Sequence, residues 1–421
     1  MRALVARPDG SLDVAPGLRP AARSGRALIA PSAADLVPLP AGATLAHLPG
    51  RTAVALRRDG TAVPVPGRLA VAAVLPVGWL RLLCPASEPV PGAARLPLFG
   101  YAAVVEHRGE PMVAALQSDD LAEWGPDRLA DSGQVEAGLA AARAALPGNR
   151  IVEQLAVCAL EHRCITARNT LERRHEGALP ASPACNADCL GCISLQSDGA
   201  APTPQPRMGH APTAAELTAL ADWHLQGDGA TIVSFGQGCE GEPLTRPDAL
   251  ERAVRRIDAL HPGATIHVNT NGSRPTALRR LLAAGLRSVR VSAISFSDPV
   301  FRAYYRPLGY DLDDVQECGR LVAAAGGQVC LNLLTFPGVT DVPEELDRTI
   351  AACRAMGVHQ VQWRSLNVDH DWLAAVLPPL GPGIGLRAAR ARLAAELPGV
   401  LHGNATRPWP HPPVLAEALK A

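Results

Sequence analysis

Between residues 179 and 370, short apolar segments alternate with longer segments in which apolar residues recur at helical spacing. The predicted strands are residues 179–183, 231–235, 265–269, 288–293, 328–334 and 359–363. The helices between them have one apolar face, such as that formed by Leu250, Val254 and Ile257. Parallel strands joined by helical crossovers form a sheet that curls, so we expect an α/β fold with a partial or full barrel of six βα units. In such folds the chemistry takes place on loops at the C-terminal ends of the strands.

This barrel is expected to be one of four parts of the chain. The parts are a β-rich N-terminal domain (1–125), a helical connector (126–178), the barrel (179–370) and a C-terminal extension (371–421). In the first part, a turn at Arg108-Gly109 predicts a hairpin of residues 101–105 with 112–116. In the last part, one helix is expected near residues 386–397. Residues 196–212, which are rich in Pro and Ala, are expected to form a flexible loop.

The overall composition narrows the classes of partner. Lys and Arg number 40, as do Asp and Glu, and this balance argues against a dedicated nucleic-acid binder, which usually carries a basic surplus. The most apolar stretch, residues 69–84, is interrupted by Pro76, Gly78 and Arg81, so we expect core strands there and no membrane span. No secretory segment follows Met1. We therefore expect a cytoplasmic protein whose ten cysteines stay reduced, so that clustered cysteines indicate metal binding.

Three of these cysteines form one compact motif, Cys185-Asn-Ala-Asp-Cys189-Leu-Gly-Cys192. Thiolates bind iron–sulfur clusters, and an ordinary electron-transfer cluster takes four of them. Three thiolates on one loop would leave one iron open to a ligand that is not part of the protein. Zinc is the alternative, but a structural zinc site usually has two paired half-sites, and no second Cys-x-x-Cys pair occurs in the chain.

With this loop placed after the first predicted strand, the chain resembles the radical S-adenosylmethionine (radical SAM) superfamily over residues 179–370. The resemblance implies a partial (βα)6 barrel of radical SAM type. It also implies a [4Fe–4S] cluster on Cys185, Cys189 and Cys192, with S-adenosylmethionine as the cofactor. The family often has an aromatic residue just before the third cysteine, and here that position is Gly191. This departure bears on contacts to the adenine of the cofactor.

A second motif, residues 236–243, follows the second predicted strand and reads Gly-Gln-Gly-Cys-Glu-Gly-Glu-Pro. Its glycines allow the backbone to approach a ligand closely, and Glu242 supplies a carboxylate for an ammonium group. Gly241, Glu242 and Pro243 match the Gly-Gly-Glu-Pro motif with which the family binds the amino group of the cofactor. Glu240 stands in place of the first glycine of that motif.

Further polar candidates lie at the ends of later strands. Asn271 follows the third strand and is a candidate to bind a ribose or carboxylate, with a simple Asn-Gly turn as the alternative. Ser292 resembles serines with which the family contacts the cofactor. Asn332 and Arg364 are candidates to face the barrel interior, and the alternative for each is a polar residue satisfied by its neighbours.

The remaining cysteines leave two hypotheses open. Cys158 and Cys164 could bind an auxiliary cluster together with Cys84 or His162, although buried structural cysteines are the commoner case. Cys239 could donate a hydrogen atom or bind metal beside the cofactor motif, with a core position as the alternative. Three others lie within helix or strand patterns and are expected in the core: Cys318, Cys330 and Cys353.

The resemblance implies an enzyme in which the reduced cluster cleaves S-adenosylmethionine and the resulting 5′-deoxyadenosyl radical abstracts hydrogen from a substrate. We expect a small-molecule substrate, and an electron donor such as a flavodoxin or ferredoxin. One alternative is a radical enzyme that modifies a protein, peptide or RNA docked by residues 1–125. The other is a non-enzymatic iron–sulfur sensor. The sequence predicts no residue that acts directly on the substrate.

Overall fold

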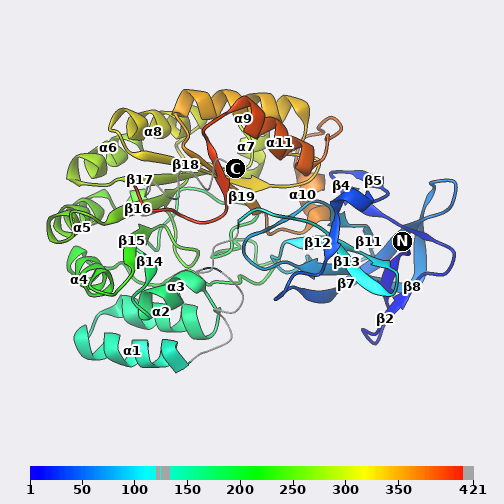
Figure 1. Ribbon diagram of the computed structural model, residues 1–421, viewed down its shortest axis with the longest axis horizontal. Helices are drawn as coiled ribbons and strands as arrows, with labels where there is room; N and C mark the ends of the chain where they lie inside the picture. The colour runs from blue at the N-terminus through cyan, green and yellow to red at the C-terminus, as the bar shows by residue number, and fades with distance from the viewer. Residues whose placement is uncertain (120–123, 125–132, 411–421) are drawn as a thin grey trace.

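The computed structural model describes residues 1–119, 124 and 133–410. Antiparallel strands form one end of the molecule, and a curled parallel sheet covered by helices forms the other (Figure 1). Helices within residues 133–171 lead from the first part to the second. The boundary predicted between residues 125 and 126 lies outside the described residues. No helix of the described ranges is long and apolar enough to cross a membrane.

The N-terminal part is rich in β-structure, as the sequence predicts. Its strands are β1 (Leu4–Ala6), β2 (Leu12–Val14), β3 (Arg19–Pro20), β4 (Ala22–Ser24), β5 (Ala27–Ile29), β6 (Leu36–Pro38), β7 (Thr44–Leu56), β8 (Ala62–Val74), β9 (Trp79–Arg81), β10 (Cys84–Pro85), β11 (Ser87–Pro89), β12 (Tyr101–His107) and β13 (Glu110–Gln117), with a 3-10 turn at Ala33–Asp35. The expected hairpin is β12–β13. Its turn contains Arg108 and Gly109, both with positive φ. Residues 69–84 contribute to β8, β9 and β10, which confirms the expectation of core strands there.

The helical connector consists of α1 (Gly133–Ala145), α2 (Arg150–Leu160) and α3 (Ile165–Leu171). Its predicted start, near residue 127, lies outside the described residues. The side chain of Asn149 caps α2 by accepting a hydrogen bond from the backbone N–H of Ile151 at 3.1 Å. The buried face of α2 includes Val152 and Leu155, two residues whose spacing predicts this helix.

The parallel sheet has seven strands in sequence order, which confirms the expected α/β architecture. The strands are β14 (His175–Ala178), β15 (Ala230–Phe235), β16 (Thr265–Thr270), β17 (Ser288–Ala293), β18 (Gln328–Thr335), β19 (Gln360–Ser365) and β20 (Leu401–Gly403). The helices are α4 (Ala214–Leu225), α5 (Pro247–Leu260), α6 (Pro275–Ala284), α7 (Asp298–Tyr305), α8 (Leu312–Ala324), α9 (Pro343–Met356), α10 (His370–Val376) and α11 (Leu386–Glu396), with a 3-10 turn at Pro243–Thr245. Figure 1 shows the helices around the outside of the curled sheet.

Two strands differ from the sequence prediction. The first strand is β14, four residues before the predicted 179–183. Pro180 and Pro183 have no N–H to donate, so the hydrogen-bonded ladder cannot continue into the predicted range. The seventh strand, β20, comes from the C-terminal extension and pairs with β19. It was not predicted because three residues are too short for a periodic pattern.

The two faces of the sheet differ in polarity. Successive residues of a strand point to opposite faces. On β17, Val289 and Val291 are completely buried in the core shared with the helices, whereas Arg290 and Ser292 belong to the opposite, inner face. The inner face also includes Asn332 of β18, which is in register with Ser292. The interior of the half-barrel is therefore polar.

The N-terminal part is joined to the rim formed by the C-terminal end of β19. Arg51 forms an ion pair with Asp369, with Nη2 and Oδ2 2.6 Å apart, and both side chains are buried. The backbone N–H of Arg81 donates to the hydroxyl of Ser365 at 2.9 Å. These contacts place β-structure from the beginning of the chain beside the mouth of the half-barrel.

The C-terminal extension runs across the opposite end of the half-barrel. The Thr406 hydroxyl donates to Glu176 of β14 at 3.2 Å, and the backbone N–H of Trp409 donates to the hydroxyl of Thr265, the first residue of β16, at 2.7 Å. These contacts lie at the N-terminal ends of the strands. The extension therefore covers the end of the sheet that lies away from the mouth.

Candidate functional site

The three-cysteine loop follows β14 and lies at the C-terminal edge of the parallel sheet. Its backbone is held by the end of α7. The N–H of Asp188 donates to the carbonyl of Tyr305 at 3.1 Å, and that of Leu190 donates to the carbonyl of Tyr304 at 3.0 Å. The loop is thus anchored to the last residues of α7.

The thiols of this loop lie close enough to influence one another. Burial, followed by the charges of Cys192 and Cys185, raises the pKa of the Cys189 thiol well above its ordinary value. Burial and then the carboxylate of Glu242 raise the pKa of Cys185, and the charge of Cys192 adds to the effect. A positively charged group bound to this loop would reverse the pKa shifts of Cys185 and Cys189.

Two polar side chains contact the third thiol. Arg207 Nη2 lies 3.5 Å from Cys192 Sγ, and Ser194 Oγ lies 3.4 Å from the same sulfur. Arg207 Nε also donates to Ser194 Oγ at 3.1 Å. Arg207 belongs to residues 196–212, which were expected to be a flexible loop. The segment contains no helix or strand, as expected of a loop, and the backbone N–H of Arg207 donates to the carbonyl of Ser194 at 2.9 Å.

The donor set suits an iron–sulfur cluster. Within the described ranges, no three His, Cys, Asp or Glu side chains converge in the way that a single bound metal ion requires. In a cluster each thiolate bonds a different iron, so the sulfurs need not converge on one point. Three thiols on one anchored loop, with an arginine beside one of them, therefore fit a cluster with three protein ligands.

The second motif lies directly against the cysteine loop. The backbone N–H of Gly241 donates to the carbonyl of Ser182 at 2.7 Å, and that of Glu242 donates to the carbonyl of Ala184 at 2.8 Å. A Cβ atom at position 241 would lie 2.0 Å from the Ala184 carbonyl oxygen. Only glycine allows this approach. The match of Gly241 to the family motif therefore has a steric reason in this chain.

The carboxylate of Glu242 joins the ends of two neighbouring strands. Its Oε1 accepts hydrogen bonds from the Leu244 N–H at 2.9 Å and the Thr270 hydroxyl at 2.6 Å, and its Oε2 accepts from the Asn271 N–H at 2.7 Å. Burial raises the pKa of this carboxyl group, and the three donors oppose that shift. A carboxylate can accept about four hydrogen bonds, so Glu242 retains capacity for one more donor.

Asn271 connects this carboxylate to the cysteine loop. Its Nδ2 donates to Asn186 Oδ1 at 3.0 Å, and Ser273 Oγ donates to the same oxygen at 3.3 Å. The structure thus brings Glu242, Asn271 and the loop of the three cysteines together. Ser292 takes part in a different contact, because its hydroxyl accepts a hydrogen bond from Asn332 Nδ2 at 3.0 Å on the inner face of the sheet.

Glu240, which departs from the family motif, holds the backbone around the site. Its Oε2 accepts from the N–H groups of Ala181 and Ser182 at 2.7 and 2.8 Å. Its Oε1 accepts from those of Gly236 and Gln237 at 2.7 and 2.6 Å. Burial raises the pKa of Glu240 to about 7, against the effect of these donors. The side chain ties the segment before the cysteine loop to the exit of β15.

We expect Glu240→Gln to destabilise the protein by about 2–4 kcal/mol. The amide group of Gln would face two backbone N–H donors, and each buried donor left unsatisfied costs about 1–3 kcal/mol. Thermal or denaturant unfolding of the two proteins measures this difference. Glu251→Gln on the surface of α5 is the matched control and should change stability by less than about 1 kcal/mol. Equal stabilities of wild type and Glu240→Gln would contradict the role assigned to Glu240.

The position before the third cysteine is occupied by Gly191 because another side chain fills the space. A Cβ atom there would lie 2.9 Å from the hydroxyl oxygen of Tyr304 and 3.1 Å from the carbonyl oxygen of Asn367. Tyr304 itself is buried, and burial raises the pKa of its phenol well above the ordinary value. An aromatic side chain at position 191 would therefore collide with α7.

The other seven cysteines lie outside the cluster loop. Cys158 of α2 and Cys239 of the second motif lie together: a hydrogen bond with Cys239 is the main reason that the pKa of Cys158 is lowered to about 6. Cys164 follows α2, and its backbone N–H donates to the carbonyl of Cys158 at 2.8 Å. Cys84 lies on β10 in the N-terminal part. Three cysteines are buried in the core as expected: Cys318, Cys330 and Cys353.

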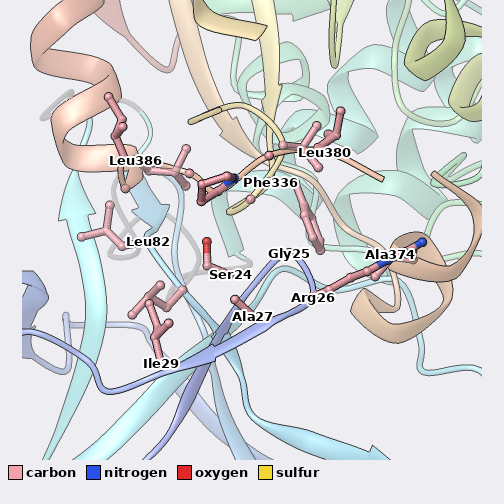
Figure 2. A pocket seen from close by; sticks show the side chains of 18 of the residues that line it. Ser24, Gly25, Arg26, Ala27, Ile29, Leu82, Phe336, Ala374, Leu380 and Leu386 are labelled. Atoms are coloured by element: carbon pink, nitrogen blue, oxygen red, sulfur yellow. The ribbon is translucent and has the colours of Figure 1, made fainter. Parts of the chain in front are cut away.

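A separate cavity lies where the N-terminal part meets the C-terminal half of the chain (Figure 2). Its volume is about 590 Å³. Figure 2 shows Ser24 and Ile29 on one side and Phe336, Leu380 and Leu386 on the other. The lining contains none of the cysteines and no residue of the second motif. It is mainly apolar and supplies no group for the chemistry considered above.

Sequence reasoning missed Arg207, Ser194 and the structural role of Glu240. Arg207 lies 15 residues after Cys192, and only the backbone fold of the intervening segment brings the two side chains together. The replacement of a family glycine by Glu240 was a signal, because a buried carboxylate beside a glycine-rich turn needs backbone donors.

Comparisons with known proteins agree with this geometry. Residues 179–352 match the family model of the radical SAM superfamily. No curated protein matches the chain significantly.

Several solved structures resemble parts of the chain. SuiB of Streptococcus suis bound to its precursor peptide SuiA is 14% identical over 51% of this chain and 43% of that chain, with a TM-score of 0.33. Methylornithine synthase is 14% identical over 63% and 77% of the two chains, with a TM-score of 0.37. A radical SAM methyltransferase from Sphaerobacter thermophilus is 18% identical over 56% and 66%, with a TM-score of 0.38. The chain spans half or less of the length of SuiB in the peptide-bound and S-adenosylmethionine-bound structures.

Proposed function

We propose that the chain is a radical SAM enzyme, because residues 179–352 match the model of that family, and that Cys185, Cys189 and Cys192 bind the family's [4Fe–4S] cluster. When bound and reduced, such a cluster cleaves S-adenosylmethionine and supplies a 5′-deoxyadenosyl radical that abstracts hydrogen from a substrate. The observation that carries this proposal is that the three-cysteine loop lies directly against the Glu242 motif, where the Glu242 N–H donates to the Ala184 carbonyl at 2.8 Å. The remaining steps depend on how the residues of this chain hold the cofactor and the substrate.

Glu242 supports binding of the cofactor's amino group. Its carboxylate acts on the Cys185 thiol, so an ammonium group beside the cluster would lie within reach of it. Gly241 allows the backbone to pass close to the cysteine loop, and Pro243 begins the 3-10 turn that follows the carboxylate. Asn271 holds Glu242 through its N–H and offers an amide beside Asn186. We assign Ser292, on the inner face of β17, to a contact with the cofactor deeper in the half-barrel.

The substrate that best fits the barrel mouth is a small molecule. The N-terminal part is fixed to the rim by the buried pair of Arg51 and Asp369. Arg81 Nη2 also donates to the carbonyl of Leu366, just beyond β19, at 3.2 Å. A mouth partly covered in this way restricts access by large substrates and by water, which suits a reactive radical.

We also propose that the chain divides into four domains. These are residues 1–125, 126–178, 179–370 and 371–421.

The second candidate is a macromolecular substrate docked by residues 1–125. The observation that favours it is the apolar cavity of Figure 2, which could hold side chains of a peptide. Ile29→Arg and Leu380→Arg would place charges in that cavity. Loss of product formation in both variants, with 5′-deoxyadenosine release intact, would favour the macromolecular substrate. Unchanged product formation would favour the small molecule.

A cytoplasmic location and a flavodoxin- or ferredoxin-type electron donor complete the proposal. All ten cysteines lie in the described ranges and are free thiols, as a reducing compartment would keep them. Chemical reduction can replace the donor in the test. The reconstituted full-length protein is incubated anaerobically with S-adenosylmethionine and dithionite, and 5′-deoxyadenosine is measured by mass spectrometry. Iron-loaded protein that forms none, with or without candidate substrates, would contradict the proposal.

Arg207→Gln should lower the reduction potential of the cluster. The guanidinium lies 3.5 Å from Cys192 Sγ, and a positive charge near a ligand sulfur stabilises the reduced, more negative cluster. We expect a shift on the order of tens of millivolts, since about 60 mV corresponds to a tenfold change for one electron. Redox titration followed by electron paramagnetic resonance measures it. Arg207→Lys keeps the charge and should restore most of the potential; equal potentials in all three proteins would refute the role of Arg207.

A further inference from the structure

The inner face of the half-barrel carries two guanidinium groups that form no ion pair with a carboxylate of the described residues. Arg290 lies on β17 and Arg364 on β19, and neither forms an ion pair with any residue in the described part of the chain. Buried cations are normally paired, because moving a charge out of water is costly. Two half-buried cations on one face of a sheet, unpaired within the described residues, therefore form a candidate site for an anion.

The two guanidiniums converge on one neutral atom. Arg290 Nη1 donates to Gln362 Oε1 at 2.8 Å, and Arg364 Nη2 lies 3.4 Å from the same oxygen. Arg364 Nη2 also donates to the backbone carbonyl of Asn404 at 2.5 Å. Burial, and then the charge of Arg290, lowers the pKa of Arg364 to about 9. Two like charges thus share one amide oxygen, an arrangement that an anion between them would relieve.

Hydrogen-bonding capacity around this pair is left unused. The Nε atoms of Arg290 and Arg364 are buried and have no partner among the described residues, and the same holds for Asn332 Oδ1. Asn332 lies between them on β18, in register with Gln362 of β19. Buried polar atoms without partners are uncommon in folded proteins, and here three of them come from three adjacent strands, β17, β18 and β19.

The nearby carboxylates are already engaged. Glu176, which acts on both guanidiniums, accepts hydrogen bonds from the hydroxyls of Ser234 and Thr406. Asp119, which also acts on Arg364, pairs with Arg407 at 2.9 Å. Among the described residues, the two guanidiniums therefore face one carboxylate, that of Glu176, which forms no ion pair with another cation, so an excess of positive charge remains.

We infer that Arg290 and Arg364 bind an anionic group of the substrate, a carboxylate or a phosphate, on the inner face of the half-barrel. Two guanidiniums can each present paired N–H donors to such an oxyanion. Asn332 Oδ1 accepts a hydrogen bond from a hydroxyl or amino group next to the anion. This inference rests on the proposed function, because it assigns the substrate class of the same enzyme.

The position of the pair favours the substrate over the carboxylate of the cofactor. Arg207 is the guanidinium that acts on Cys185 at the cluster loop, whereas Arg290 acts on the thiol of Cys330, in register with it on the inner face. Glu242 and Asn271 lie at the strand ends beside the cluster loop. An anion held by Arg290 and Arg364 would therefore lie deeper in the half-barrel than these cofactor-binding candidates.

Calorimetry on the anaerobically reconstituted full chain tests the inference, with inorganic phosphate and acetate as probes at constant ionic strength. Wild type should bind at least one probe, and Arg290→Gln and Arg364→Gln should each weaken that binding by about tenfold or more. Arg364→Lys keeps a charge and should bind better than Arg364→Gln. Arg280→Gln, on the surface of α6 with its own acidic partners, is the matched control and should bind as wild type does.

Each outcome of this experiment has one meaning. Failure of folded wild type to bind either probe would overturn the inference, as would equal weakening in Arg280→Gln. A loss of S-adenosylmethionine affinity of about tenfold in both glutamine variants would overturn it as well, because the anion would then be the cofactor's carboxylate. Probe binding by protein that forms no 5′-deoxyadenosine would support the anion site and contradict the proposed function. Formation of 5′-deoxyadenosine by protein that binds neither probe would overturn the anion site and leave the proposed function intact.

Discussion

Replacing any one of Cys185, Cys189 and Cys192 by Ala should reduce 5′-deoxyadenosine formation to background. Each thiolate is proposed to bond a different iron, so two remaining thiolates cannot hold a cluster with a single open iron. The loop itself should survive the change, because its backbone is held by hydrogen bonds to Tyr304 and Tyr305 of α7. Iron content, visible absorbance and 5′-deoxyadenosine, measured on the same reconstituted samples, test this expectation.

Cys353→Ala is the matched control for these variants. Cys353 is buried within α9 and is the last cysteine of the chain, so the substitution removes a thiol without touching the cluster loop. It should lower stability slightly and leave iron content and 5′-deoxyadenosine formation near wild-type levels. If a cluster-loop variant kept full iron and full turnover, the assignment of that cysteine would be wrong. If all four variants lost iron equally, the loss would reflect general instability.

The parts of the fold that could be predicted from sequence are those specified by local signals. The helix α6 ends at Gly285, which adopts φ 116° as a left-handed C-cap, and α4 begins with the capping box of Thr213 and Glu216. Strand β17 has the predicted bounds because its apolar residues are flanked by clear helix stops. By contrast, β20 depends on pairing with β19, and three residues contain no periodic signal.

The same distinction between local signals and long-range contacts applies to the candidate site. The cysteine spacing and Gly241-Glu242-Pro243 can be read locally, because their chemistry is concentrated in one loop each. The contacts of Arg207 with Cys192 and of Glu240 with Ala181 depend on segments that meet only in the folded chain. Sequence alone also left open whether Arg364 was satisfied by its neighbours. The structure shows that Arg364 contacts the side-chain oxygen of Gln362 on β19, and that Arg290 of β17 donates to the same oxygen.

Glu242→Gln should weaken the binding of S-adenosylmethionine by about 10- to 100-fold. Gln keeps one oxygen that can accept from Leu244 and Thr270, but it removes the negative charge and places an amide N–H₂ opposite the N–H of Asn271. A hydrogen bond to a charged group contributes about 1.5–3 kcal/mol, which corresponds to this range of affinity. Anaerobic calorimetry with S-adenosylmethionine on cluster-loaded protein measures the change.

Glu242 is buried and holds the strand ends together, so its replacement could lower stability as well as affinity for S-adenosylmethionine. The melting temperature of the variant shows how much structure is lost, and iron content shows whether the neighbouring cluster loop stays intact. Glu251→Gln, on the outer surface of α5, removes the same charge far from the strand ends and should bind the cofactor as wild type does. A folded, iron-loaded Glu242→Gln protein with wild-type affinity would show that this carboxylate does not bind the cofactor's ammonium group. In that case its three hydrogen bonds would leave it with a structural role only, comparable to that of Glu240.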